Sequence, residues 1–292
     1  MLKYKIITDS SSSITQEEAD KMGIIVLPLT LSYNGKDYMD GIDITTDEFY
    51  EMIFAEENKK APFPKSSMVG PNVFKETFEK LLKEGYTPVV LPIAKVLSGT
   101  YQSAVIARDM FEDEIIVVED STTALGSVKV MIEGILSDEY ENVEALKAKI
   151  DYLKKHINFY AVPETLAYLA KGGRLGKFSA RVGNFLHFKP VIQLDYEGVL
   201  VPIDRPRGLK HAFKAVSDYL NDNPIDFNYP CEFGYSTKEE NVKALIEACK
   251  TKLSGDYTCA QISPVVGAHV GPGASALFYI AKNEVDKKLK KD

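Results

Sequence analysis

The feature that most constrains this chain is an alternation in its first half, where short β-rich apolar runs are followed by segments with apolar residues at helical spacing. This alternation is typical of βα units built around a mainly parallel sheet. The expected strands are residues 4–8, 24–30, 87–93 and 115–118, and the expected helices are 15–22, 71–84, 100–110 and 124–136. We therefore predict an α/β fold class, with an N-terminal, mainly parallel sheet and flanking helices.

Small polar residues follow three of these expected strands, in segments 9–13, 97–100 and 120–123. In an open parallel sheet, such loops share one edge, and ligands bind in the crevice outside the carboxyl ends of the strands. The sequence therefore predicts a hydroxyl-rich polar site at that edge.

The second half of the chain has a different pattern. Apolar runs at 190–194 and 199–203 flank Tyr196-Glu197-Gly198, which predicts an antiparallel pair of strands. Strand-like runs at 230–235, 257–262 and 275–281 alternate there with helical patterns at 209–221 and 239–252. This half is therefore expected to be a C-terminal α+β domain with antiparallel strands.

The boundary between the two halves is expected close to Asn158, where a helical pattern at 142–155 ends. The predicted domains are residues 1–160, of the α/β type, and residues 161–292, of the α+β type. A length of 292 residues and a hydrophobic content of 45% suit two such domains.

Two connecting segments in the first half are also informative. The pair Asn34-Gly35 lies between β-compatible residues and predicts a hairpin turn. The proline-containing segment 61–67 is not expected to be helical, and it delivers the hydroxyl of Ser66 just before a helix that begins near Pro71. Ser66 is thus a candidate anion donor, and an ordinary turn or capping function is the commoner alternative.

The composition excludes several classes of function. A net charge of −7 opposes binding to nucleic acid, whose protein partners are normally basic. Three cysteines without a CxxC pair and four scattered histidines predict no metal site. Neither GxxxxGK[ST] nor a GxGxxG after a strand occurs, so no nucleotide cofactor is expected. Without a signal peptide or an apolar run of roughly 20 residues, we expect a cytoplasmic protein with no stable membrane insertion.

The segment Ser98-Gly99-Thr100 is the main candidate for an anion site, because it stands where a buried strand leads into a helix. The first N–H groups of a helix lack intrahelical partners and lie at the positive end of its dipole, so they can hold a carboxylate or a phosphate. The alternative is that Ser98 or Thr100 only caps its own helix.

A basic island in this acidic chain is the second candidate. Gly172 and Gly173 precede Arg174, and Arg207 follows further along the sequence. Glycines beside an arginine permit a close approach of a phosphorylated group. The alternative is a helix that ends at a glycine with cations in its last turn. His269 lies alone among glycines and a proline, and such a histidine is usually structural, but a tight turn is a costly place for a bulky polar ring that has no function.

Five segments together resemble the DegV family, and their order covers nearly the whole chain. They are Ile7-Thr8-Asp9-Ser10-Ser11-Ser12, Asp40-Gly41-Ile42-Asp43-Ile44, Leu97-Ser98-Gly99-Thr100-Tyr101-Gln102-Ser103-Ala104, Gly172-Gly173-Arg174-Leu175 and His269-Val270-Gly271-Pro272-Gly273.

The resemblance implies a two-domain carrier for a long-chain fatty acid, with the lipid site between the domains or at their junction. Such a carrier has no catalytic residues or cofactor of its own. It presents the carboxylate of an acid such as palmitate to the catalytic subunit of a fatty acid kinase, which makes the acyl phosphate for phospholipid synthesis.

The same resemblance assigns functions to single residues. Ser98 matches the carboxylate-binding serine of the family, with the amides of Gly99 and Thr100 beside it, and His269 matches a histidine at the carboxylate end of the lipid. Ser66 stands where the family usually has the threonine of a KTSQPSP motif, and Met68 and Val69 replace the usual Gln-Pro. Arg174 and Arg207 match arginines associated with phosphotransfer or kinase docking.

The alternative hypothesis is a stand-alone enzyme that acts on a small acyl or phosphorylated substrate. It would use Ser98 as nucleophile or binder and His269 as general base. The sequence contains no GxSxG elbow, which disfavours this hypothesis. A DNA-associated regulator is disfavoured by the negative charge.

Overall fold

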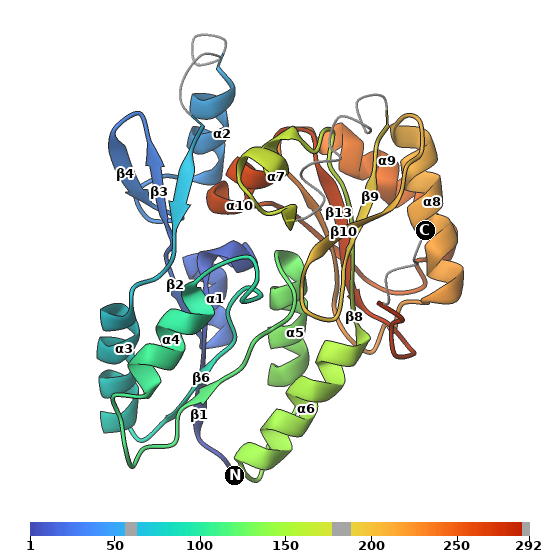
Figure 1. Cartoon of the computed structure of the whole chain (residues 1–292). Coiled ribbons are helices and arrows are strands. Elements are labelled where there is room, and N and C mark those ends of the chain that lie inside the picture. The colour runs from blue at the N-terminus through green and yellow to red at the C-terminus, as the bar shows by residue number, and fades with distance from the viewer. Residues whose placement is uncertain (56–62, 177–187, 288–292) are drawn as a thin grey trace.

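Three β-sheets organise the described part of the chain in the computed structural model, which covers residues 1–55, 63–176 and 188–287 (Figure 1). The first sheet contains β1 (Tyr4–Asp9), β2 (Ile25–Leu27), β6 (Thr87–Val90) and β7 (Val117–Val118). Its order is β2-β1-β6-β7 and all its strands are parallel, which confirms the predicted N-terminal α/β architecture.

The predicted strand 24–30 is divided between two sheets. β2 ends at Leu27, and β3 (Thr30–Tyr33) begins three residues later in another sheet. Pro28 lies between them, and a proline has no N–H to donate to a strand ladder, so the parallel pairing stops there.

Helices cover both faces of the first sheet. Ile7 and Val90 pack on one face with α3 (Pro71–Lys83) and α4 (Thr100–Arg108). Their neighbours Ile6 and Val89 pack on the other face with α5 (Gly126–Leu136) and α6 (Val143–His156), as the two-residue period of a strand requires. These four helices agree with the predicted helical segments to within two residues at each end.

The second sheet is formed by the second half of the chain. Its strands are β8 (Ile157–Val162), β9 (Val191–Leu194), β10 (Leu200–Asp204), β11 (Cys231–Tyr235), β12 (Thr258–Gln261) and β13 (Ser275–Ile280). The order is β10-β9-β8-β13-β11-β12, and every pair is antiparallel except β11 with β12. The expected antiparallel α+β half is therefore confirmed, whereas the division into domains at residue 160 stays a prediction.

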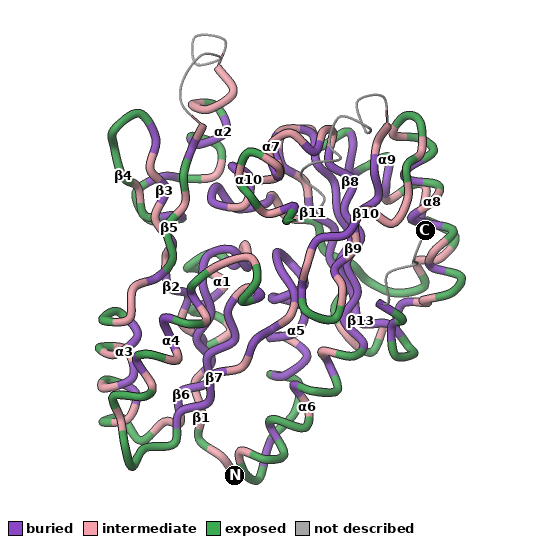
Figure 2. Tube along the Cα trace, viewed as in Figure 1, coloured by how far each residue is buried: buried purple, intermediate pink, exposed green. Residues whose placement is uncertain are grey.

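The two large sheets share α5 as a common layer. Phe278 of β13 belongs to the same core as the apolar residues of α5, and Leu277 and Tyr279 point to the opposite core under α8 (Leu209–Asp222) and α9 (Glu239–Cys249). Figure 1 shows the resulting succession of layers, from α3 and α4 through both sheets to α8 and α9. The central strands are almost wholly buried (Figure 2).

The third sheet is small and lies outside the other two. β3 pairs antiparallel with β4 (Lys36–Met39) and with β5 (Lys65–Ser67), in the order β4-β3-β5. The predicted hairpin is present at Asn34-Gly35, and both residues have positive φ, as a type I′ turn requires. Of the non-helical segment 61–67, residues 61 and 62 lie outside the described residues. β5 contains Ser66, whose side chain is partly buried.

Three short helices were not expected from the sequence pattern. They are α2 (Thr46–Phe54), α7 (Ala167–Lys171) and α10 (Pro264–Val270). The other helical elements among the described residues are η1 (Ser10–Ser12), α1 (Gln16–Met22) and η4 (Lys250–Lys252). None of the helices within the described ranges combines the length and the apolar character that a membrane crossing needs.

Candidate functional site

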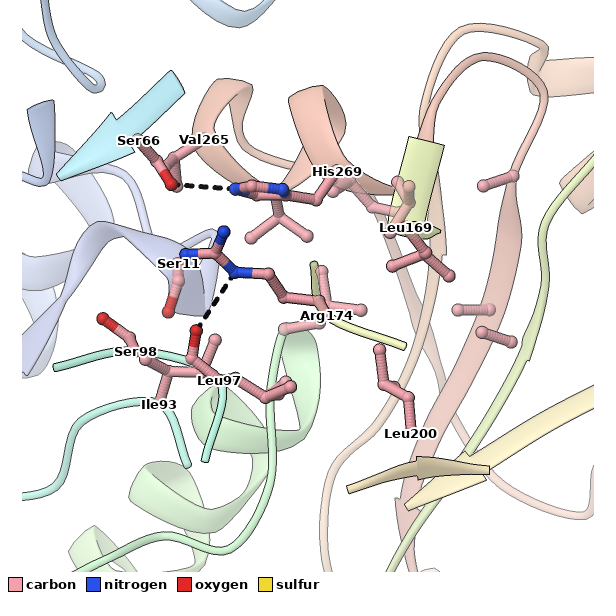
Figure 3. Close-up of a pocket in the computed structure, with 18 of the residues that line it drawn as sticks. Ser11, Ser66, Ile93, Leu97, Ser98, Leu169, Arg174, Leu200, Val265 and His269 are labelled. Carbon is pink, nitrogen blue, oxygen red and sulfur yellow. Dashed lines mark hydrogen bonds between the residues drawn. The ribbon is translucent and has the colours of Figure 1, made fainter. Parts of the chain in front are cut away.

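A cavity of about 230 Å³ lies between the two large sheets (Figure 3). Its walls come from η1, from β5 and the residue after it, from the segment after β6, from the start of α5, from the second sheet, and from α7 and α10. The cavity therefore forms only where both halves of the chain and the small third sheet meet.

Most of the cavity wall is apolar. Ile93, Leu97 and Leu125 come from the first half of the chain, and Phe159 and Leu200 come from strands of the second sheet. In the view of Figure 3, Leu169 and Leu200 lie away from the labelled polar side chains. The cavity thus has an apolar part and a polar end, which suits an amphipathic ligand.

The polar end contains a hydrogen-bonded pair formed by Ser66 and His269. The Ser66 Oγ and the His269 Nε2 are 2.8 Å apart, although the residues are 203 positions apart in the chain. β5 positions Ser66 by pairing it with Leu31 of β3, and the last turn of α10 carries His269. The imidazole lies so close to Gly172 that a Cβ at this glycine would collide with Nδ1.

His269 is neutral in this environment. Burial, followed by the positive charge of Arg174, lowers its pKa to about 4. A neutral imidazole has a single N–H, and Nδ1 is buried without a hydrogen-bond partner among the described residues. With the proton on Nε2, His269 donates to the Ser66 oxygen and leaves the Ser66 hydroxyl hydrogen free to donate to a ligand.

Arg174 supplies the positive charge of the polar end. Its Nε donates to the Leu97 carbonyl at 3.3 Å, and its Nη1 donates to the Gly172 carbonyl. Within the described ranges no carboxylate lies within ion-pair distance of this half-buried guanidinium, and burial lowers its pKa. A buried cation without a counter-charge costs free energy, so an anion here stabilises the site.

The glycines before Arg174 fulfil both of the functions considered from the sequence. The Arg174 N–H bonds to the Leu169 carbonyl and the Gly173 N–H bonds to the Ala170 carbonyl, which is the Schellman ending of a helix. The αL backbone that this ending needs is at Gly173, with a φ of +74°. The helix end thus places Arg174 against the cavity.

The segment 98–100 is also both a cap and a part of the cavity wall. α4 begins at Thr100, whose N–H donates to the Ser98 Oγ at 3.3 Å, and the two hydroxyl oxygens are 2.9 Å apart. Ser98 and Gly99 line the cavity. Thr100 is fully buried and does not line it, so this residue supports Ser98 instead of facing a ligand.

Ser11, and Asp9 behind it, were not assigned to the site from the sequence. Ser11, in the hydroxyl run after β1, lines the cavity, and both its N–H and its hydroxyl donate to Asp9. Asp9 also accepts from the Ile93 N–H at 3.0 Å, and burial raises its pKa. Asp9 thus holds η1 and the segment after β6 together behind the site. The run of serines after β1 was the sequence signal that could have identified this part of the site.

Arg207 lies apart from this group. It is exposed, does not line the cavity, and its guanidinium lies 5.5 Å from the centre of the Phe188 ring. The enzyme hypothesis needs Ser98 beside His269, whereas the described hydrogen bonds join His269 to Ser66 and Ser98 to Thr100. No group of three or more His, Cys, Asp or Glu side chains suited to a metal occurs in the described part of the chain.

Comparisons with known proteins match the chain to a single family. A family model described as an uncharacterised protein of the DegV family matches residues 3–282. A DegV domain-containing protein of Caldanaerobacter subterraneus is 32% identical, over 97% of this chain and 100% of the relative.

Two solved structures of similar proteins carry ligand information. A DegV family protein of Thermus thermophilus, described for its fatty acid binding, has a TM-score of 0.86 and 27% identity, over 96% of this chain and 100% of that one. A stearic-acid-binding protein of Eubacterium ventriosum has a TM-score of 0.80 and 28% identity, over 96% of this chain and 98% of that one.

Proposed function

Because the chain belongs to the DegV family, we propose that it binds a long-chain fatty acid in the cavity between its two large sheets. The observation that carries this proposal is Arg174, a half-buried cation with no carboxylate partner in the described residues, at one end of an apolar cavity. A single negative charge joined to a hydrocarbon chain complements both features. The fatty acid ligands of the similar proteins support the same conclusion.

The two parts of the cavity contribute differently to binding. Each buried methylene contributes about 0.8 kcal/mol, so the apolar wall supplies most of the affinity for a chain such as that of palmitate. The carboxylate would otherwise lose its hydration, and hydrogen bonds from Ser66, Ser98 and Arg174 offset that loss. With its proton on Nε2, His269 would donate to the Ser66 oxygen and hold Ser66 in the donating orientation. The Gly99 N–H and Thr100 complete the start of α4 beside the carboxylate.

We further propose that the carboxylate is presented to a separate fatty acid kinase in the cytoplasm, as a step towards phospholipid synthesis, and that this chain is not itself the enzyme. Gly99 is exposed, so the polar end of the cavity reaches the surface where a kinase could approach it. Arg174 would face the incoming phosphate. The exposed Arg207 is proposed as a docking residue for the kinase.

Native mass spectrometry of the purified chain tests the binding proposal. We expect an added mass that corresponds to one long-chain fatty acid, or its appearance after incubation with palmitate. A chain that carries no fatty acid and takes none up would refute the proposal.

The division of functions between Ser98 and Arg174 is tested with two single variants. We expect both variants to weaken palmitate binding, and only Arg174→Ala also to reduce acyl-phosphate formation at saturating palmitate when a fatty acid kinase is supplied. Calorimetry measures the first step and phosphate transfer from ATP measures the second. Equal acyl-phosphate formation by the two variants at saturating palmitate would contradict this division.

A further inference from the structure

A methionine covers the polar end of the cavity from the solvent side. Met68 follows β5 directly, and its Sδ lies against Gly99, so close that a Cβ at this glycine would collide with it. The side chain lines the cavity and is nevertheless 50% exposed. Met68 therefore lies between the proposed carboxylate position and the solvent.

The contact between Met68 and Gly99 restricts the space around the head group. Ser98 and Gly99 form the cavity wall beside the proposed carboxylate, and the methionine occupies the open face of Gly99. A thioether is apolar and has no hydrogen-bond donor, so it offers an anion nothing in exchange for lost hydration. Its unbranched chain has three rotatable bonds and can be displaced as a unit.

We propose that Met68 is the residue that sets head-group specificity at this site. A planar carboxylate binds with the methionine in contact with Gly99, whereas a larger tetrahedral anion, such as a phosphate head, binds only after the methionine has left that contact. This inference rests on the proposed fatty acid function and extends it from the acyl chain to the head group.

The expected size of the effect follows from the contact that is lost. Displacement of the half-exposed Met68 side chain from Gly99 should cost the larger anion about tenfold in affinity, which corresponds to about 1.4 kcal/mol. We therefore expect the ratio of palmitate affinity to hexadecyl phosphate affinity to be about tenfold higher with the methionine than without it.

Calorimetry with palmitate and with hexadecyl phosphate tests this proposal on the full chain. Met68→Ala should reduce the preference for palmitate about tenfold, and Met68→Leu, which keeps an apolar side chain of similar size, should retain most of it. Met110→Ala is the matched control, because Met110 is also 50% exposed and does not line the cavity. An unchanged ratio of affinities in Met68→Ala would overturn the proposal.

The methyl resonance of Met68 gives a second readout that a merely structural residue would not provide. The chain has seven methionines, so ¹³C-methyl labelling gives few signals, and Met68→Leu assigns the relevant one. Hexadecyl phosphate should shift this signal towards that of a solvent-exposed methionine, and palmitate should leave it near its position in the free protein. If neither ligand binds, the proposed function itself is wrong. If both ligands bind and shift this signal equally, the proposed function stands and only the head-group inference is wrong.

Discussion

Gly172 and Gly173 are adjacent, yet each is a glycine for a different reason. Gly172 has an ordinary φ of −72°, and what excludes a larger residue there is the His269 imidazole. Gly173 has space around it and a φ of +74°, so what excludes other residues is the backbone conformation. One glycine serves the site and the other serves the end of α7.

This difference predicts separate outcomes for two alanine variants. In Gly172→Ala the added Cβ displaces the His269 ring and breaks the bond to Ser66, so palmitate affinity should fall roughly fivefold, the equivalent of one hydrogen bond of about 1 kcal/mol. Gly173→Ala should instead lower the free energy of unfolding by about 1–2 kcal/mol, with affinity nearly unchanged. Calorimetry and urea unfolding measure the two quantities, and wild-type affinity in Gly172→Ala would contradict the prediction.

At single positions, the sequence indicated much of the polar end. Ser66, Ser98, Gly99, Arg174 and His269 all line the same cavity. Thr100 and Arg207 do not line it. Thr100 is fully buried at the start of α4, and Arg207 is exposed. Met68 could not be assigned a contact from the sequence, since its approach to Gly99 depends on how β5 packs on another segment.

Length alone does not decide which helices could be predicted, since the seven-residue α1 was expected and the nine-residue α2 was not. α3 and α6 repeat an apolar face over three or more turns, which the periodicity detects. α2 and α10 are shorter, and their stability comes from contact with each other: Tyr50 packs on Gly267 and its hydroxyl donates to the Ile262 carbonyl at 3.0 Å. A stretch of sequence does not contain such a long-range contact, although the capping box of Thr45 and Glu48 marked the start of α2.

The central helix α5 is joined to two other elements by a buried ion network. The Lys129 ammonium lies 2.8 Å from Glu18 of α1 and 2.8 Å from Glu232 of β11, and the Lys129 and Glu232 side chains are 8% and 3% exposed. Removal of the lysine alone would leave a buried carboxylate without its partner.

We therefore expect Lys129→Met to reduce the free energy of unfolding by about 3–5 kcal/mol, as measured by urea denaturation. The double variant Lys129→Met/Glu232→Gln should recover part of this loss, because it also removes the unpaired charge. A loss below about 1 kcal/mol in the single variant would show that the network does not join these elements.

Asp40 lies where the small sheet, η1 and α10 meet. It follows β4 of the small sheet, accepts from Ser10 of η1 at 2.7 Å, and faces the N-terminus of α10, where the Val265 amide, like the Ser10 hydroxyl, acts to lower its pKa. Its Oδ1 is buried with no hydrogen bond in the described residues, and burial raises the pKa of this carboxyl to about 7, with Asp9 adding repulsion.

The free energy of unfolding of the whole chain should therefore depend on the protonation of Asp40. Between about pH 4 and 7 the folded state holds a proton that the unfolded chain has released, so the contribution of Asp40 is lost as pH rises through 7. From pH 5.5 to 8 the free energy of unfolding of Asp40→Asn should gain about 2 kcal/mol relative to the wild type.

Urea denaturation across this pH range measures that difference, with the exposed Asp113→Asn as control. His269 titrates in the opposite sense, since its lowered pKa of about 4 makes the folded state lose stability as pH falls below 6.5. Because His269 is present in every variant, its contribution cancels in the comparison. A pH-independent difference between Asp40→Asn and the wild type would contradict the prediction.

The position of Ser66 on β5 has a consequence for how such a protein can diverge. β5 has three residues and, among the described strands, pairs with β3 alone, at the edge of the smallest sheet. The residues of this strand and Met68 belong to neither large core, so substitutions at these positions cost little folding stability. The head-group end of the cavity is therefore free to change under selection while the acyl-chain end, built from the shared core of the two large sheets, remains constrained.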